Sequence, residues 1–120
     1  MPIRKPNFTP PFNIVRASHV EFGVRDLNAS RAFYVDCLGY LITDDDPDAI
    51  YLRAVEERNH HSIVLRKAKE PSIPALGYKV ASEEDLDRAA FWFAHKGFPT
   101  SFPEIPYQGR TLRTCDIFGM

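Results

Sequence analysis

The sequence predicts an α+β fold made of two βαβββ units, the second of which stops before its last strand. The chain repeats itself at an offset of about 57 residues, so that 18–40 resembles 75–98 in its order of apolar and polar residues. Within each copy, a run of alternating apolar residues precedes a run with helical periodicity. In addition, 44% of the 120 residues are apolar, which suffices to bury the core of one domain.

Residues 1–13 are expected to form an extended N-terminal arm ahead of a single domain at 14–120. Four of these residues are proline, which fixes φ and removes a backbone donor, so neither a helix nor a central strand can form there. Phe8 and Phe12 are candidates to hold the arm on a surface, and a loose chain end is the alternative. The domain itself divides into units 14–70 and 71–120.

The first unit opens with a predicted strand at 18–25 that has one apolar face. Its two faces are Val20, Phe22 and Val24 on one side and His19, Glu21 and Gly23 on the other. Because successive side chains of a strand point to opposite faces, the apolar set should face the core. A helix should follow from a cap at Asp26 or Asn28 as far as Leu38, and Gly39 should end it in the left-handed conformation.

A hairpin and a further strand complete the first unit. The hairpin strands at 40–43 and 50–54 flank an acidic turn at 44–48, and the last strand spans 60–67. Calcium binding at the turn is not predicted. An EF-hand loop needs Gly at its sixth position and Glu at its twelfth, and this chain has Ala49 and Val55 there.

The second unit repeats this order up to its third strand. A strand at 75–80 leads into a helix that begins at the capping pair Ser82 and Asp85 and ends at Gly97. Strands at 98–102 and 110–117 then flank a loop, and the chain ends at Met120, where the last strand should begin. We therefore expect either that the natural polypeptide continues past Met120 or that another chain covers the open edge of strand 110–117.

Charge and composition exclude several classes of partner. A net charge of -1 and a pI of about 6.4 provide no basic patch for nucleic acid. No apolar run approaches the roughly 20 residues of a membrane span, and the N-terminus lacks the apolar core of a signal peptide. Cys37 and Cys115 form no C-x-x-C motif, and we expect both to be free, mostly buried thiols in a cytoplasmic protein.

Two segments of the first unit carry more specific motifs. One spans 13–34 and contains D-L-x-x-S-x-x-F-Y at 26–34, and the other combines I-Y-L-R at 50–53 with E-E at 56–57, H-H at 60–61 and V-L-R at 64–66. Together they resemble the type I extradiol ring-cleavage dioxygenases of the vicinal-oxygen-chelate superfamily, which also contains glyoxalase I and bleomycin-resistance proteins. Within that family, the resemblance is to the N-terminal domain of the 3,4-dihydroxyphenylacetate (homoprotocatechuate) 2,3-dioxygenases, and it spans nearly the whole chain.

This resemblance implies the paired βαβββ architecture of the superfamily, with two such domains in each subunit. The C-terminal domain would hold Fe(II), or sometimes Mn(II), on two His and one Glu. It would use oxygen for the meta-cleavage of a catechol such as 3,4-dihydroxyphenylacetate in aromatic degradation. This chain would be the non-catalytic N-terminal domain and inactive by itself. Its partners would be the C-terminal domain and further copies in a homo-oligomer, and the catechol would bind only to the parent enzyme.

The residues at the family's ligand positions imply that this segment holds no metal. The first ligand position matches His19. It is a weak candidate because the chain has no second or third ligand side chain at the other positions. The second position has Ala75, and the third falls on the missing strand, with Val64 as its counterpart in the first unit. His60 and His61 should point to opposite faces of a strand and so cannot chelate one ion. We predict no catalytic, cofactor-binding or metal-binding residue in this segment, and no cofactor.

Two other functions remain open on the sequence. A stand-alone glyoxalase or bleomycin-resistance-type metalloenzyme would build its site between two chains, and Ala75, Val64 and the missing strand argue against it. A small-ligand-binding or regulatory module, such as a ferredoxin-like domain, would also contain two related βαβ halves. The extra strand in each unit argues against that module. A metal analysis of the purified chain separates the metalloenzyme from the other two.

Overall fold

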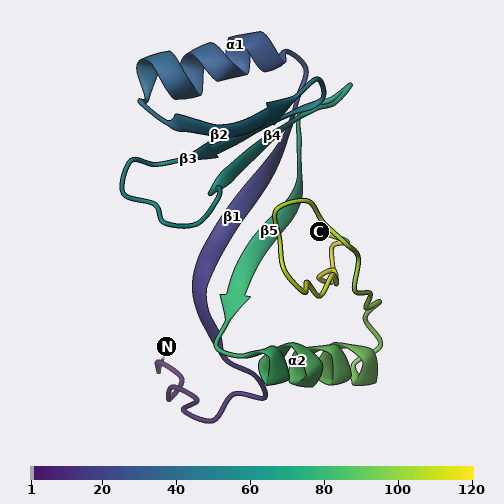
Figure 1. Ribbon diagram of the computed structural model, residues 1–120. Helices are drawn as coiled ribbons and strands as arrows, with labels where there is room; N and C mark the ends of the chain where they lie inside the picture. The colour runs from purple at the N-terminus through teal and green to yellow at the C-terminus, as the bar shows by residue number, and fades with distance from the viewer. Residues whose placement is uncertain (1) are drawn as a thin grey trace. The chain divides into compact units, whose positions relative to one another are not determined.

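The computed structural model of the chain describes residues 2–120 (Figure 1). The elements are, in chain order, β1 (Ile14–Val24), α1 (Leu27–Arg31), its π-helical continuation η1 (Ala32–Cys37), β2 (Leu41–Asp46), β3 (Ala49–Arg53), β4 (Ile63–Lys67), β5 (Ser72–Val80) and α2 (Glu83–His95). Over residues 2–120, the strands form one five-stranded sheet in the order β2-β3-β4-β1-β5. The α+β class and the βαβββ order of the first unit are therefore confirmed.

The chain divides into two compact units, and each is described by itself. One comprises residues 16–79 and Met120, and the other comprises residues 2–15 and 80–119. The first contains almost the whole sheet together with α1 and η1. The second contains the N-terminal arm, α2 and the segment that follows α2.

The sheet is mixed. Strands β1 and β4 are parallel, with Val20 opposite Ile63 and Phe22 opposite Leu65, whereas β3 is antiparallel to both β2 and β4. Strand β5 lies beside β1 at the edge of the sheet and runs in the opposite direction (Figure 1). The strand that opens the second repeat of the sequence therefore completes the sheet of the first.

The core lies between the sheet and the α1–η1 helix. It is centred on buried residues of two neighbouring strands, namely Ile50, Leu52, Ile63 and Leu65. The predicted apolar face of β1 packs against this cluster, and so do Tyr34 and Val35 of η1. Phe22 stacks on Tyr34 with ring centroids 6.4 Å apart, whereas Phe33 is 52% exposed. The expected face of β1 is thus confirmed.

Local signals at the ends of this helix act as predicted. The Asp26 carboxylate accepts the Ala29 N–H at 3.0 Å and caps α1, so Asp26 rather than Asn28 is the cap. Gly39 has a φ of 77°, the left-handed conformation that most residues adopt only at a cost. The Tyr40 N–H then reaches back to the Tyr34 carbonyl at 3.0 Å, which satisfies one of the last helical carbonyls.

The hairpin and β4 differ from the prediction in their limits. The acidic residues 44–46 belong to β2, and the turn is shorter than expected because the Asp46 carboxylate accepts the N–H groups of both Asp48 and Ala49 at 2.8 Å. Strand β4 begins at Ile63 rather than at position 60. His60 and His61 therefore lie in the loop before the strand.

Helix α2 begins and ends where the sequence predicts. Ser82 caps it by accepting the Asp85 N–H at 3.2 Å, and Gly97 follows it with a φ of 84°. The predicted strands at 98–102 and 110–117 do not form. In their place is one isolated antiparallel bridge, in which Ser101 and Arg113 exchange hydrogen bonds of 3.0 and 2.8 Å.

Two prolines explain why this bridge does not grow into a ladder. In an antiparallel pair, hydrogen-bonded positions recur every two residues, so the next donors on either side of Ser101 would be residues 99 and 103. Both are proline, which has no N–H to donate. The expectation of an open strand edge along 110–117 was therefore wrong.

Two further expectations concern membranes and thiols. Among residues 2–120, no helix has the length and the apolar character needed to cross a membrane. Cys37 and Cys115 are free, as predicted, but Cys37 is exposed rather than buried.

Candidate functional site

Three histidines and a tyrosine gather on the sheet of the unit 16–79, and we call them the histidine cluster: His19, Tyr51, His60 and His61. Strand β1 contributes His19, β3 contributes Tyr51, and the loop before β4 contributes the adjacent pair. The ring centroid of His61 lies 5.0 Å from that of His19 and 5.2 Å from that of Tyr51. Alternation along β3 explains this placement, because Tyr51 and its neighbours Ile50 and Leu52 point to opposite faces.

The adjacent pair converges instead of pointing to opposite faces. The Nδ1 atoms of His60 and His61 are 2.9 Å apart, which is a hydrogen-bond distance. The expectation that the two rings point apart was wrong, because strand alternation applies only from Ile63 onwards. One ring must donate its Nδ1 proton while the other accepts, so the two rings hold different tautomers whenever both are neutral.

Burial keeps the centre of the cluster uncharged near neutral pH. His61 is only 5% exposed, and this burial together with the neighbouring His19 and His60 lowers its pKa from 6.5 to about 4, against the opposing effect of Glu21. Burial also lowers the pKa of His19, and Glu21 again opposes the shift. At pH 7, His19 and His61 are therefore packed, uncharged rings at the centre of the cluster.

The carboxylate nearest to His19 in sequence is bound by an arginine. Arg66 Nε donates to Glu21 Oε1 at 2.6 Å, and this hydrogen bond raises the pKa of Arg66. Glu21 lies on β1, and Arg66 lies on the parallel neighbour β4 opposite Gly23, two residues further along β1. Because the guanidinium holds Glu21, a metal ion at His19 would have to compete with an ion pair for this carboxylate.

The cluster does not match the ligand set of a dioxygenase site. Among residues 2–120, no group of three or more His, Cys, Asp or Glu side chains is arranged to hold a metal ion. At the second ligand position, Ala75 has only a methyl group. Val64, the first-unit counterpart of the third position, is buried in the apolar cluster with Ala49 and Tyr51. A facial site needs two His and one carboxylate on one ion, so the residues present do not fit Fe(II) or Mn(II). The absence of metal from the chain stays a prediction.

A small cavity of about 230 Å³ borders His19. Its lining is Ala17, Ser18, His19, Val20, Ser62, Leu76, Gly77 and Tyr78. The Ser18 hydroxyl lies 3.3 Å from His19 Nδ1. The cavity therefore presents hydroxyl groups and an uncharged imidazole, which are suited to hydrogen bonding with a small polar molecule rather than to nucleophilic catalysis.

The sequence placed His19 correctly on β1 but did not indicate two residues around this site. One is Tyr51, which contacts His61 and was recognised only as part of the I-Y-L-R motif. The other is Gly77, over which the His19 ring lies. A glycine inside a strand pattern often marks a close approach, and this signal was available in the run at 75–80.

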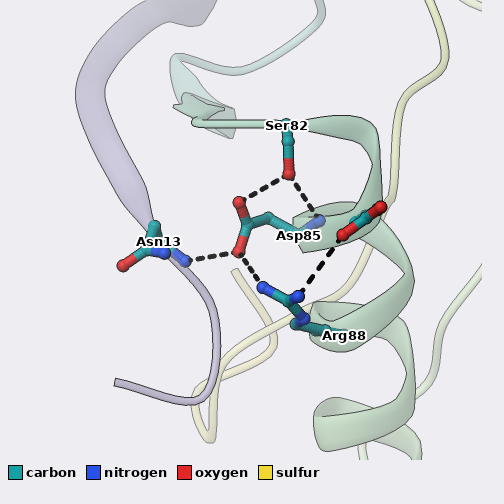
Figure 2. A network of polar contacts seen from close by, with 5 residues as sticks. Asn13, Ser82, Asp85 and Arg88 are labelled. Carbon is teal, nitrogen blue, oxygen red and sulfur yellow. Dashed lines mark hydrogen bonds and ion pairs between the residues drawn. The ribbon is translucent and has the colours of Figure 1, made fainter. Parts of the chain in front are cut away.

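A second polar network in the other unit is structural (Figure 2). Asp85 is 2% exposed, and its carboxylate accepts the Ser82 hydroxyl at 2.8 Å, the backbone N–H of Asn13 at 3.1 Å and the Arg88 guanidinium at 3.4 Å. The hydrogen bonds from Ser82 and Asn13 hold the pKa of Asp85 below its usual range. The capping pair was predicted, but its bond to residue 13 was not.

Comparison with known proteins finds similarity to part of several dioxygenases. The chain is 37% identical to the metapyrocatechase of Pseudomonas sp. (strain CF600) over 76 aligned residues. The aligned region covers 62% of this chain and 25% of the relative. The chain superimposes with a TM-score of 0.86 and 36% identity on homoprotocatechuate 2,3-dioxygenase of Brevibacterium fuscum in complex with 3,4-dihydroxyphenylacetate, over 98% of this chain and 38% of that one. The homoprotocatechuate 2,3-dioxygenase of Arthrobacter globiformis matches with a TM-score of 0.85 and 35% identity, over 95% and 38% of the two chains.

These matches confirm the resemblance inferred from the motifs, and they span only part of each relative. The chain covers about a quarter of the metapyrocatechase and less than two fifths of each dioxygenase structure. Residues 16–112 also match the sequence model of a protein family. The chain belongs to the Glyoxalase/Bleomycin resistance protein/Dioxygenase superfamily.

Proposed function

We propose that this chain is the non-catalytic N-terminal domain of an extradiol catechol dioxygenase. One observation carries the proposal: the chain aligns over 98% of its own length with a TM-score of 0.86, yet it accounts for only 38% of the dioxygenase that it matches. A domain of this kind contributes stability and contacts, while another part of the polypeptide contributes the reacting groups.

The ligand positions support a non-catalytic role. Of the ligand positions within this chain, His19 alone has a ligand side chain, since Ala75 and Val64, the first-unit counterpart of the third position, carry hydrocarbon alone. Val64 is also buried in an apolar cluster, where an unpaired carboxylate would be costly. In this proposal the catalytic, cofactor and metal residues all lie in a C-terminal domain of the parent enzyme.

The parent enzyme would be a cytoplasmic homo-oligomer that uses Fe(II) or Mn(II) and oxygen. Its substrate would be a catechol such as 3,4-dihydroxyphenylacetate, the molecule named in the complex of the Brevibacterium fuscum relative. The metal would activate the catecholate and oxygen on adjacent open coordination positions. The role proposed for this chain is to pack on the catalytic domain and to contribute contacts between subunits.

Two measurements test the proposal. The coding sequence beyond codon 120 should encode a second pair of βαβββ units with two His and one Glu at the ligand positions, and a stop codon there would contradict the proposal. The purified chain, incubated with Fe(II) without oxygen and then desalted, should retain no stoichiometric metal and cleave no catechol in air. His19→Ala should leave the metal content unchanged. About one iron or manganese per chain would instead favour the stand-alone metalloenzyme.

A further inference from the structure

The N-terminal arm exposes apolar side chains although its base is firmly attached. Ile3 is 96% exposed and Phe8 is 87% exposed. At the base, Asn13 donates its N–H to the Asp85 carboxylate (Figure 2). The Asn13 carbonyl accepts the Ala81 N–H at 3.0 Å, so both backbone groups of Asn13 are hydrogen-bonded. The Phe12 ring contacts Trp92 of α2, with centroids 5.9 Å apart. The arm therefore leaves the unit in a fixed place.

An apolar groove of about 360 Å³ lies where the arm leaves α2. Its lining is Pro10, Pro11, Phe12, Asn13, Ile14 and Trp92. A cavity of roughly 150 Å³ already accepts a benzene ring, so the groove is large enough for an aromatic side chain. Trp92 provides the flat surface on which such a ring packs well.

The arm of the same chain does not fill this groove. Phe8 remains exposed, and the residues between it and Phe12 include Pro10 and Pro11, which form part of the groove wall. Because both prolines have fixed φ, the segment cannot reverse direction within two residues and insert Phe8 into a wall that it forms itself. An occupant must therefore be something other than the arm of the same chain.

Charge and spacing identify a suitable occupant. The arm carries Arg4 and Lys5. The first turn of α2 exposes Glu83 and Glu84, of which Glu84 also contacts Arg88 at 3.4 Å, whereas Asp85 is buried. Four extended residues span about 12 Å, and eight helical residues rise about 12 Å. An arm laid along α2 with its Phe8 at Trp92 would thus bring its Arg4 close to Glu84. The spacing and charge of the arm therefore match the spacing and charge of the α2 surface of the same protein.

We propose that residues 2–11 dock on a second copy of this chain, with Phe8 of each copy in the groove beside Trp92 of the other. The exchange is reciprocal, because two arms that run antiparallel past each other bring both Phe8–Trp92 contacts together around a two-fold axis. This docking rests on the self-association included in the proposed function. The surface that would mediate the self-association is the arm together with the groove beside Trp92.

The single tryptophan of the chain makes the groove observable. The mass of the full chain would be measured by analytical ultracentrifugation as a function of concentration, in parallel with Trp92 emission. We expect a dimer whose emission moves to longer wavelength on dilution, as Phe8 leaves the groove and water enters. Phe8→Ser should weaken association about 100-fold, because a symmetric pair loses two contacts each worth about tenfold, and its emission should not depend on concentration.

Phe118→Ser is the matched control, because Phe118 is 86% exposed and lies outside the arm. It should associate like the unmodified chain, and circular dichroism should show all three proteins equally folded. If the Phe8→Ser chain associates as strongly as the unmodified chain, the arm is not the contact, although self-association itself stands. If the unmodified chain is a monomer at every concentration, both the docking and the proposed self-association are overturned.

Discussion

The imidazole of His19 lies directly over the backbone of Gly77 on the neighbouring strand β5. A methyl group added at Gly77 would lie 2.2 Å from His19 Cε1, 2.4 Å from Nδ1 and 2.8 Å from Nε2, closer than any real Cβ contact. The two strands are neighbours in the sheet, so the ring occupies the space that a side chain at position 77 would take. The position that matches a metal ligand in the family is thus filled, in this chain, by a packing contact.

Gly77→Ala should therefore destabilise the fold, because the added methyl group forces the His19 ring out of place. The expected loss is about 1–3 kcal/mol, the usual range for overpacking, measured by urea denaturation. Adding His19→Ala should recover most of this loss, since the smaller side chain makes room for the methyl group. Gly109→Ala is the control, because nothing lies within 4 Å of a methyl group there. Equal stability of the Gly77→Ala and Gly109→Ala chains would show that the contact is not tight.

The histidine cluster should make stability fall as the pH decreases through the range from about 6.5 to 4. The pKa of His61 is about 4 in the folded chain and 6.5 in the unfolded one, so the unfolded state takes up a proton first. This difference contributes about 2 kcal/mol of stability at pH 7 that is lost by pH 5. The unfolding free energy of the native chain, measured from pH 7.5 to 4, should therefore fall more steeply than that of His61→Asn. Parallel curves for the two proteins would contradict the assignment.

Asp85→Ala should release the base of the N-terminal arm. The substitution removes the acceptor for the Asn13 N–H and for the Ser82 hydroxyl at once, so both donors lose their partner. Hydrogen exchange of the Asn13 amide should accelerate at least tenfold, and the thermal midpoint should fall. Glu84→Ala is the control, because the Glu84 side chain is 82% exposed. Unchanged exchange at Asn13 would mean that another contact holds the arm.

The bridge at Ser101 should lengthen when the neighbouring prolines are replaced. Pro99→Val with Pro103→Val restores N–H groups at the next two hydrogen-bonded positions on either side of the bridge. The new amides at 99 and 103 should exchange slowly, and the strand signal in circular dichroism should increase. Pro106→Val, which lies outside the bridge, should produce neither change. Rapid exchange at both new amides would indicate that something other than the prolines limits the pairing.

Much of the fold was predictable from residues that act on their near neighbours. The alternation of Val20, Phe22 and Val24 identified the core face of β1, because side chains of a strand alternate whatever lies around them. The caps at Asp26 and Ser82 were predictable because each bonds an amide three residues away. The prolines at 99 and 103 were equally visible, but their effect depends on a register that only the bridge to Arg113 defines.

The candidate site depended on contacts that no local pattern determines. His19 meets Gly77 only because β5 returns along β1, and Asn13 meets Asp85 across 72 residues of chain. His60 and His61 converge because β4 begins three residues later than its apolar alternation suggests. The sequence by itself determined the order of elements in the first unit, the limits of α2 and the family, since these depend on propensities and motifs within a few residues. Only the tertiary structure decided which side chains meet, because such contacts depend on strand order, register and loop path, and these are properties of the whole sheet.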